Sequence, residues 1–150
     1  MTTEFRRAAI PEDLRALVRF DRLVFPSDYF PASLWREYEA WWLIVDGRRV
    51  GCCAFERHVN FTGDPVAGSL YIASTAIHPR FQRQGLGRLF KAWQIAYARA
   101  NGFRRIVTNS RRSNKAMIRL NREFGFRIVR TSRGYYENPR EATVVMERAI

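Results

Sequence analysis

A short glycine-containing turn between an apolar strand and an amphipathic helix is the feature that most constrains how this chain folds. Residues 69–77 (SLYIASTAI) are predicted to form a buried strand, and residues 86–100 are predicted to form a helix. The connecting run HPRFQRQGLG places Gly85 and Gly87 at the start of that helix. Glycine lets an anion approach the backbone N–H groups that the first helical turn leaves without partners. The turn therefore predicts either a plain link or a cradle for a phosphate group.

The rest of the chain alternates strand and helix patterns without a repeat, a low-complexity tract or a linker. Further strands are expected over residues 4–10, 103–110, 126–136 and 142–150, and a hairpin over 41–59 that turns at Asp46-Gly47. Further helices are expected from Pro11 to Val24, over 32–40, and from a Ser113 cap to Phe124, with a loop over 60–68. The order β-α-α-β-β-β-α-β-α-β-β predicts one α/β (α+β) domain spanning residues 1–150, with a mixed sheet and helices on its faces. The helix over 86–100 is expected to bury Leu89, Trp93, Ala96, Tyr97 and Ala100.

The composition restricts the class of protein. Hydrophobic residues make up 47% of the chain, which argues against disorder, yet no apolar run is long enough to cross a membrane. The first residues lack a signal-peptide core, and Cys52 and Cys53 are adjacent, so we expect a reduced, cytoplasmic protein without a disulfide or a zinc site. The net charge of +12, carried almost entirely by arginine, favours anionic partners such as nucleotides, RNA or ribosomes.

The turn and the segment that follows it together resemble a known superfamily. Gln82 to Gly87 matches the pattern Q/R-x-x-G-x-G/A directly after a strand that ends in His78-Pro79. Asn114-x-Ala116-x-x-x-Leu120 and Phe124-Gly125-Phe126 follow at a characteristic distance. In this combination the chain resembles the GNAT superfamily of acetyl-CoA-dependent N-acetyltransferases. The resemblance implies a mostly antiparallel, twisted sheet of about seven strands with about four helices, in which the fourth and fifth strands splay apart.

The same resemblance implies a site for acetyl-CoA and no metal. The diphosphate of CoA would rest on the backbone N–H groups of one continuous segment, and the pantetheine would pair with the fourth strand. The residues so implied are Arg83, Gln84, Gly85, Leu86, Gly87 and Arg88 for the diphosphate, Thr75, Ala76 and Ile77 for the pantetheine, and Asn114 at the start of the next helix. The amine would attack the acetyl carbon directly, without a covalent enzyme intermediate.

Two further stretches resemble the protein N-terminal acetyltransferases, including the bacterial enzymes that act on ribosomal proteins. Phe25-Pro26 ends the first helix, and Tyr135-Tyr136 precedes the last strand. By this resemblance both pairs flank an entering peptide N-terminus, so a peptide or protein amine is the expected acceptor. Packing alone also accounts for each of these aromatic residues. A ribosome or RNA partner and a monomer or homodimer are compatible with the sequence.

The residues expected to move protons depart from the family pattern. Asn109 stands where relatives carry a Glu or His base, and Asn121 stands where the superfamily carries an acid tyrosine. Tyr71, Asn109 with a bound water, and Tyr136 are the remaining catalytic candidates, with Glu56 as a further one. An α-amine is neutral at pH 7 for about 1 kcal/mol, whereas a lysine amine requires about 4–5 kcal/mol, so a site without a strong base favours the α-amine.

Other readings stay open at the level of sequence. The acceptor could be aminoacyl-tRNA, a small metabolite or an antibiotic, whereas a polyamine is disfavoured by the positive charge. A non-catalytic CoA-binding module is the alternative from another functional class. His78 is expected to be a turn residue, and Cys52 and Cys53 are expected to pack in a strand rather than act as nucleophiles.

Overall fold

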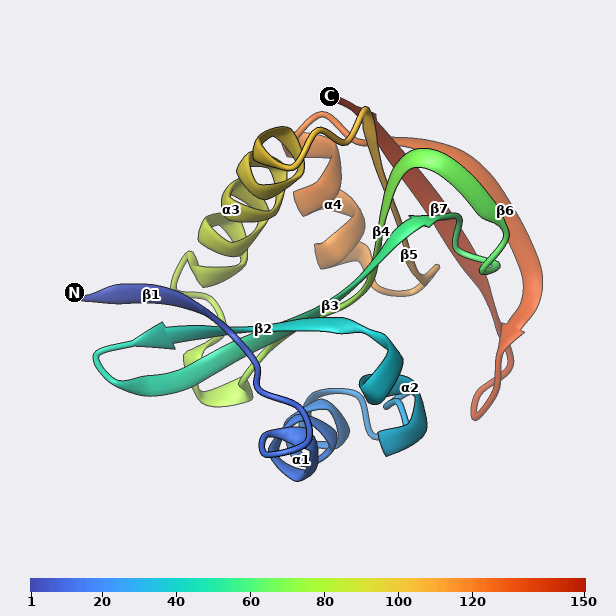
Figure 1. Ribbon diagram of the computed structural model, residues 1–150. Coiled ribbons are helices and arrows are strands. Elements are labelled where there is room, and N and C mark those ends of the chain that lie inside the picture. Colours follow the sequence, from blue (N-terminus) through green and yellow to red (C-terminus); the bar gives the residue numbers. More distant parts are fainter. The chain divides into compact units, whose positions relative to one another are not determined.

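The computed structural model describes all 150 residues and contains seven strands, four α-helices and one short 3₁₀ helix. The elements are β1 (Thr3–Arg7), α1 (Leu14–Val24), α2 (Ala32–Glu37), β2 (Glu39–Val45), β3 (Arg48–Val59), β4 (Pro65–Ile77), η1 (Pro79–Phe81), α3 (Leu86–Ala100), β5 (Arg105–Arg111), α4 (Lys115–Glu123), β6 (Arg127–Tyr136) and β7 (Glu141–Ala149) (Figure 1). The strands form one sheet in the order β1-β2-β3-β4-β5-β7-β6. The predicted order of elements and the predicted mixed sheet are confirmed.

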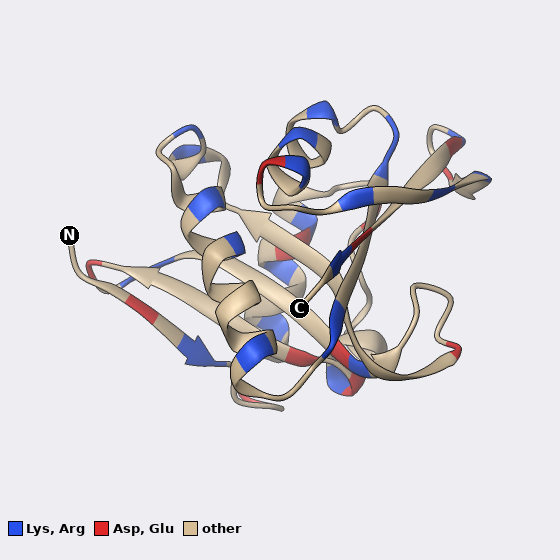
Figure 2. Ribbon diagram, turned by 90° about the horizontal axis from the view of Figure 1, so that it is seen from above, with Lys and Arg blue, Asp and Glu red and all other residues tan.

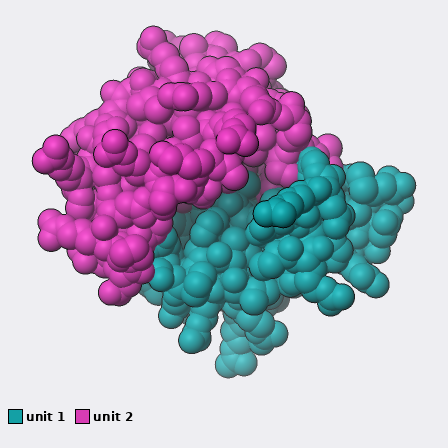
Figure 3. Space-filling model, turned by 180° about the vertical axis from the view of Figure 1, so that it is seen from behind, with its two compact units in different colours: residues 1–56, 74–86 teal, residues 57–73, 87–150 magenta.

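The chain divides into two compact units, which are coloured separately in Figure 3. Unit 1 comprises residues 1–56 and 74–86, and unit 2 comprises residues 57–73 and 87–150. Strands β3 and β4 and helix α3, whose first residue Leu86 belongs to unit 1, therefore contribute residues to both units.

Unit 1 contains an antiparallel ribbon of β1, β2 and the first part of β3, together with α1 and α2. Asp46 and Gly47 both have positive φ, of 50° and 79°, which is the backbone geometry of a two-residue hairpin turn and confirms the predicted hairpin. Two predicted helix boundaries are wrong. Helix α1 begins at Leu14 rather than Pro11, and α2 ends at Glu37 because the chain from Glu39 pairs with Phe55 in the ribbon.

Unit 2 contains β5, β7 and β6 in antiparallel pairing, and the first part of β4, which is parallel to β5. Figure 1 shows α3 and α4 on the same side of β5 and β7. The predicted loop over 60–68 is shorter than expected, because β4 already begins at Pro65. None of the helices is both long and apolar enough to cross a bilayer.

The buried face of α3 differs from the prediction. Ala96 and Ala100 are exposed, while Leu89, Trp93 and Tyr97 are only partly buried. The buried residues are instead Leu86, Phe90, Lys91, Gln94, Ile95 and Ala98. The buried stripe includes the polar residues Lys91 and Gln94. A prediction based only on apolar residues therefore chose the neighbouring face of the helix as the buried one.

Candidate active site

The turn between β4 and α3 has an unusual backbone that its own side chains support. Arg83 and Gly85 have φ of 62° and 79°, so the left-handed region is visited twice within three residues. The Gln82 side chain donates from Nε2 to the Ile77 carbonyl at 3.0 Å, and His78 Nδ1 accepts from the Arg80 N–H at 3.1 Å. The predicted role of His78 as a turn residue is consistent with this contact.

The space beside Gly85 is open, because no heavy atom lies within 4 Å of the position that a Cβ would occupy. Gly87 is closely packed instead, since a Cβ there would lie 3.5 Å from Leu120 Cδ2 of α4. Helix α3 runs for 15 residues from Leu86, so its first N–H groups and its dipole present partial positive charge at the turn.

Arg88 contributes its backbone to this segment, whereas its side chain is engaged elsewhere. The guanidinium pairs with Glu123 and lies 5.3 Å from the centre of the Phe124 ring. Any contact of Arg88 with an anion at the turn therefore falls to its N–H group.

Asn114 caps helix α4, and the predicted Ser113 cap is wrong. Asn114 Oδ1 accepts from the Met117 N–H at 3.2 Å, while Ser113 Oγ donates to Glu141 Oε1 at 2.9 Å. The hydrogen bonds from Ser113, together with Arg111, hold the pKa of Glu141 below its usual range. Glu141 therefore attracts Ser113 away from the cap position, and the neighbouring asparagine takes it.

Strands β4 and β5 pair only along their first parts. The parallel register runs from Ser69 with Arg105 to Ile72 with Thr108, and both strands continue beyond it. The Thr108 hydroxyl donates to the Ile72 carbonyl at 3.0 Å where this register ends. Asn109 is the first residue of β5 past the paired part, as expected for splaying strands.

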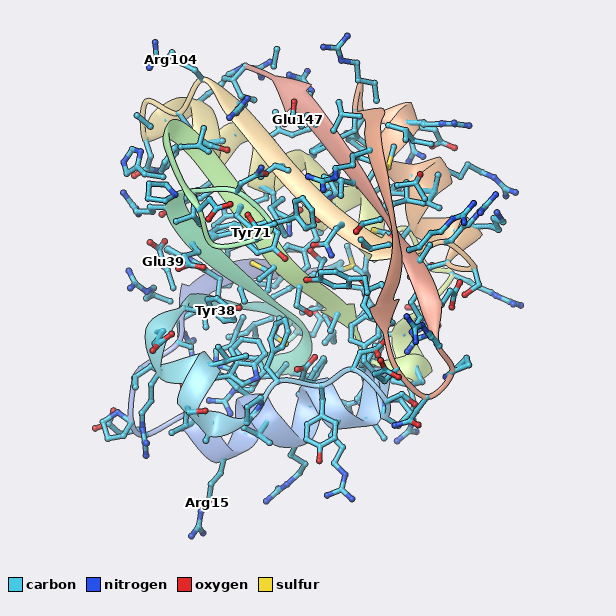
Figure 4. The ribbon with its side chains drawn as sticks, turned by 90° about the vertical axis from the view of Figure 1, so that its right-hand side faces the viewer. Arg15, Tyr38, Glu39, Tyr71, Arg104 and Glu147 are labelled. Atoms are coloured by element: carbon cyan, nitrogen blue, oxygen red, sulfur yellow. The ribbon has the colours of Figure 1, made fainter.

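The three predicted catalytic residues lie together in unit 2. Tyr71 Oη donates to Asn109 Oδ1 at 2.6 Å, and Asn109 Nδ2 donates to Tyr136 Oη at 3.3 Å. Asn109 Nδ2 also donates to Thr143 Oγ1 at 3.0 Å, a contact that the sequence did not predict. Tyr71, which is labelled in Figure 4, belongs to a buried hydrophobic cluster with Phe61, Val107 and Val145. The hydrogen-bonded group thus consists of two phenols, one amide and one buried hydroxyl.

The residues predicted to contact a peptide belong to different units. In unit 2, Tyr135 is 43% exposed, and its ring centre lies 4.8 Å from that of Tyr136. In unit 1, Phe25 ends α1 and donates its N–H to the Asp21 carbonyl at 2.7 Å, and Pro26 is exposed.

Asp21 is a functional candidate that the sequence reasoning missed. It is 1% exposed, and its Oδ2 accepts from the Phe30 N–H at 2.7 Å, so it ties α1 to the segment between Phe25 and α2. Burial raises the pKa of its carboxyl group to about 6. The spacing Leu14, Leu17, Asp21 on one helical face was the available signal.

The other residues considered as catalytic or metal-binding candidates lie within strands, helices or the buried core. Asn121 is buried, with Nδ2 3.8 Å from Met146 Sδ, and its Oδ1 has no hydrogen-bond partner. His58 Nδ1 accepts from the Gly68 N–H at 3.0 Å, and Glu56 lies half-buried on β3 in unit 1. Cys52 and Cys53 are buried and form no disulfide. No group of three or more His, Cys, Asp and Glu side chains is arranged to hold a metal ion.

The predicted cofactor residues are likewise divided. Unit 1 carries Thr75, Ala76 and Ile77 of β4 and the turn from Arg83 to Leu86. Unit 2 carries Gly87, Arg88 and Asn114. Residues 83–88 nevertheless form one continuous stretch of backbone.

The sheet order, the parallel β4–β5 pair and the four helices agree with the fold that the sequence predicted. The family model described as "Acetyltransferase (GNAT) family" matches residues 11–126. The chain belongs to the GNAT acetyltransferase family, and it is an acyltransferase.

Individual relatives resemble the chain along its whole length. An N-alpha-acetyltransferase of Sulfurisphaera tokodaii is 27% identical over 150 residues, covering 93% of this chain and 90% of the relative. The ribosomal-protein-S18-alanine N-acetyltransferase from Escherichia coli superposes with a TM-score of 0.83 at 21% identity, covering 99% of this chain and 94% of the other. The NatC complex bound to Gag peptide and CoA contains a chain with a TM-score of 0.83 at 14% identity, covering 100% and 99%. At these identities the solved structures show a common fold.

Proposed function

We propose that the protein transfers an acetyl group from acetyl-CoA to the α-amine of a peptide or protein N-terminus. The observation that carries this proposal is the composition of the group around Asn109. Its hydrogen bonds go to Tyr71, Tyr136 and Thr143, and none goes to a carboxylate or an imidazole. The group itself contains no carboxylate or imidazole that could deprotonate an ammonium group, so it favours an amine that is already partly neutral.

The acetyl-CoA part of the proposal is supported by the turn. Backbone N–H groups from Arg83 to Arg88 would receive the diphosphate, with the open side of Gly85 leaving room for it. The backbone of Thr75, Ala76 and Ile77 would hold the pantetheine. Asn114 has committed its Oδ1 to capping α4, so its NH₂ group would be the part that contacts the cofactor.

The acceptor part is supported by the exposed aromatic pair and by the names of relatives. Tyr135 with Tyr136 and Phe25 with Pro26 would flank the peptide. The 27% identical relative is named an N-alpha-acetyltransferase, and the Escherichia coli enzyme is named for an alanine of ribosomal protein S18. In the reaction, the amine nitrogen bonds to the acetyl carbon as the carbon–sulfur bond breaks. The proton that the nitrogen loses would pass to the departing CoA thiolate, directly or through a water molecule, so that the products are the N-acetyl amide and CoA. An N–H group near Ile77 would stabilise the thioester oxygen as it gains charge.

Two matched peptides test the choice of amine. One carries an unblocked N-terminus and no lysine, and its twin has a blocked N-terminus and one lysine. We expect thiol release from acetyl-CoA to be at least about tenfold faster with the first peptide at pH 7, because the lysine amine is about 3 kcal/mol harder to deprotonate.

Equal rates on the two peptides would contradict the α-amine as acceptor. Calorimetric titration with CoA separates the two parts of the proposal. Binding of CoA without turnover of either peptide would point to another amine, such as aminoacyl-tRNA, and absence of binding would contradict the cofactor site itself.

A further inference from the structure

The orientation of the Asn109 side chain decides what Tyr71 can do. An asparagine amide has an oxygen end that only accepts hydrogen bonds and a nitrogen end that only donates them. Turning the amide over would exchange these ends and would reverse the role of every hydroxyl in contact with it. The neighbours of Asn109 therefore determine in which direction the Tyr71 hydroxyl points.

A backbone carbonyl fixes that direction. Thr143 Oγ1 lies 3.1 Å from the Ser110 carbonyl oxygen, which can only accept, so the single Thr143 hydroxyl proton points at Ser110. Toward Asn109, 3.0 Å away, Thr143 can then only accept. The NH₂ end of Asn109 must face Thr143, and the oxygen end must face Tyr71.

Thr143 is well placed to hold this arrangement. Thr143 is fully buried on β7 and lies opposite Ser132 of β6 in the strand register. The alternative contact of its hydroxyl with Tyr136 Oη is longer, at 3.4 Å. Because Thr143 is buried, the arrangement in which Asn109 donates to it is far more favourable than the reversed one, in which two acceptor oxygens would face each other.

We infer that Thr143 and the Ser110 carbonyl orient Asn109 so that Tyr71 donates to it, leaving the Tyr71 oxygen to act only as an acceptor for the substrate amine. This inference rests on the proposed function for its substrate. Thr143 is a positioning residue in this scheme, since it acts through Asn109. Tyr71 would receive an amine N–H and aim the nitrogen lone pair at the acetyl carbon.

The hydrogen-bonded path from Tyr71 through Asn109 and Thr143 to the Ser110 carbonyl cannot carry a proton away from the amine. It passes through an amide, which neither gains nor loses a proton in the physiological range, and it ends on a carbonyl. The charged groups near this hydrogen-bonded path form ion pairs with one another. Arg111 of β5 lies 4.7 Å from the centre of the Tyr136 ring on β6 and pairs with Glu141 of β7 at 3.1 Å. Glu147 of β7 lies 3.8 Å from Arg105.

The decrease of kcat/KM toward low pH, which is the acid limb of its pH profile, tests the inference in the unmodified enzyme. Two peptides are used whose N-terminal amines titrate at different pH values. If the amine must arrive neutral, the acid limb moves with the pKa of the peptide amine. An acid limb at the same pH for both peptides would reveal a titrating enzyme base and would overturn the inference.

Substitutions of Thr143 test its part. Thr143→Val removes the acceptor for Asn109, and we expect kcat/KM to fall about tenfold or more, mostly in kcat, because the amine is misaligned. Thr143→Ser keeps the hydroxyl and should rescue most of the loss. Thr131→Val, an equivalent change at an exposed position of β6, is the matched control. Equal losses in the valine and serine variants would overturn the role of the hydroxyl.

Nuclear magnetic resonance gives a readout that does not require turnover. In protein labelled at asparagine, the Asn109 NH₂ protons, identified by their loss in Asn109→Ala, should show Overhauser contacts with the Thr143 methyl group. Contacts with the Tyr71 ring instead would overturn the inference. A protein that shows the expected contacts but acetylates no peptide would contradict the proposed function and leave the orientation intact.

Discussion

At the scale of single residues, the chemistry of a side chain depends on which neighbours it meets. Asn109 is a poor catalyst by itself, yet its contacts with Tyr71 and Thr143 give a nearby phenol a defined direction. Asp21 shows the same dependence through burial. A surface aspartate has a pKa near 4, whereas burial raises the pKa of Asp21 to about 6.

The raised pKa of Asp21 predicts a pH-dependent stability. Because the pKa of Asp21 in the folded state lies above its unfolded value of 3.8, the folded state binds the proton more tightly than the unfolded state. The stability that this proton provides is fully present below pH 3.8 and is lost as the pH rises through about 6. The shift corresponds to a loss on the order of 3 kcal/mol between acid and neutral pH. We expect Asp21→Asn to remove most of this dependence, as measured by urea unfolding at pH 4, 5 and 7. Parallel pH profiles for the two proteins would contradict it.

The hydrogen bond from Phe30 to Asp21 is a separate contribution. Asp21→Ala would leave the Phe30 N–H without its partner, which costs about 1–3 kcal/mol at every pH. Comparing the alanine and asparagine variants therefore distinguishes the hydrogen bond from the charge.

At the scale of elements, the turn before α3 combines backbone strain with an open surface. Arg83 adopts a left-handed conformation although it is not glycine, and such positions persist where a structure holds a ligand loop in place. Gly85 has the same freedom with no neighbour within 4 Å of a hypothetical Cβ. Both features suit the approach of an anion to the backbone.

Gly85→Ala tests the cradle against a matched control. Gly47 in the hairpin turn has the same φ of 79° and equally open surroundings, so an alanine at either position should cost a similar amount of folding stability, about 1 kcal/mol. Only Gly85→Ala should weaken CoA binding, about tenfold or more by calorimetry, because its methyl group would occupy the place of the diphosphate. Similar CoA affinities in the two variants would contradict the cradle.

At the scale of the whole molecule, the positive charge is spread widely. Figure 2 shows basic positions on the helices and along the strands, with fewer acidic ones among them. In unit 2, Arg112, Lys115, Arg119 and Arg122 are exposed in the segment that leads into and along α4. Lys115, Arg119 and Arg122 share one face of the helix, and buried Ile118 and Asn121 lie on another. Arg127, Arg130 and Arg133 follow on exposed positions of β6.

This distribution predicts salt-dependent binding of RNA through phosphate contacts. Replacing Lys115, Arg119 and Arg122 by glutamine should lower the slope of log affinity against log salt by about 2, because fewer counterions are released. Peptide acetylation at fixed salt should change little. Filter binding or fluorescence anisotropy with a single-stranded RNA, from low to physiological salt, measures the slope.

Helix α1 offers the matched control, since Arg15, Arg19 and Arg22 repeat the same spacing on exposed positions. Figure 4 shows Arg15 projecting away from the ribbon. We expect a smaller effect there, because Glu12 and Asp13 precede the helix and Asp28 follows it. An equal reduction from both sets would indicate that only total charge matters, which would contradict a binding surface on α4.

Local patterns were sufficient for the order of elements and for the position of the turn before α3. The Asp46-Gly47 hairpin, the turn at Gly85 and the strand pattern of residues 69–77 depend on neighbouring residues in the chain, so they could be predicted. The resemblance to a family suggested that Tyr71 and Asn109 act together, but it did not place Tyr136 or Thr143 beside them, since no local rule joins residues so far apart.

The tertiary structure decided the features that depend on competition between distant groups. Glu141 recruits Ser113 and thereby leaves the cap of α4 to Asn114, and burial selects the face of α3 that contains Lys91 and Gln94. The direction of the Asn109 amide follows from Thr143 and a carbonyl on the neighbouring residue. The sequence by itself determined where strands, turns and helices form, because those choices rest on backbone geometry and short-range spacing. Which polar atoms are desolvated and which partners they find was decided only by packing, because hydrogen bonds and burial are shared among segments that meet only in the folded chain.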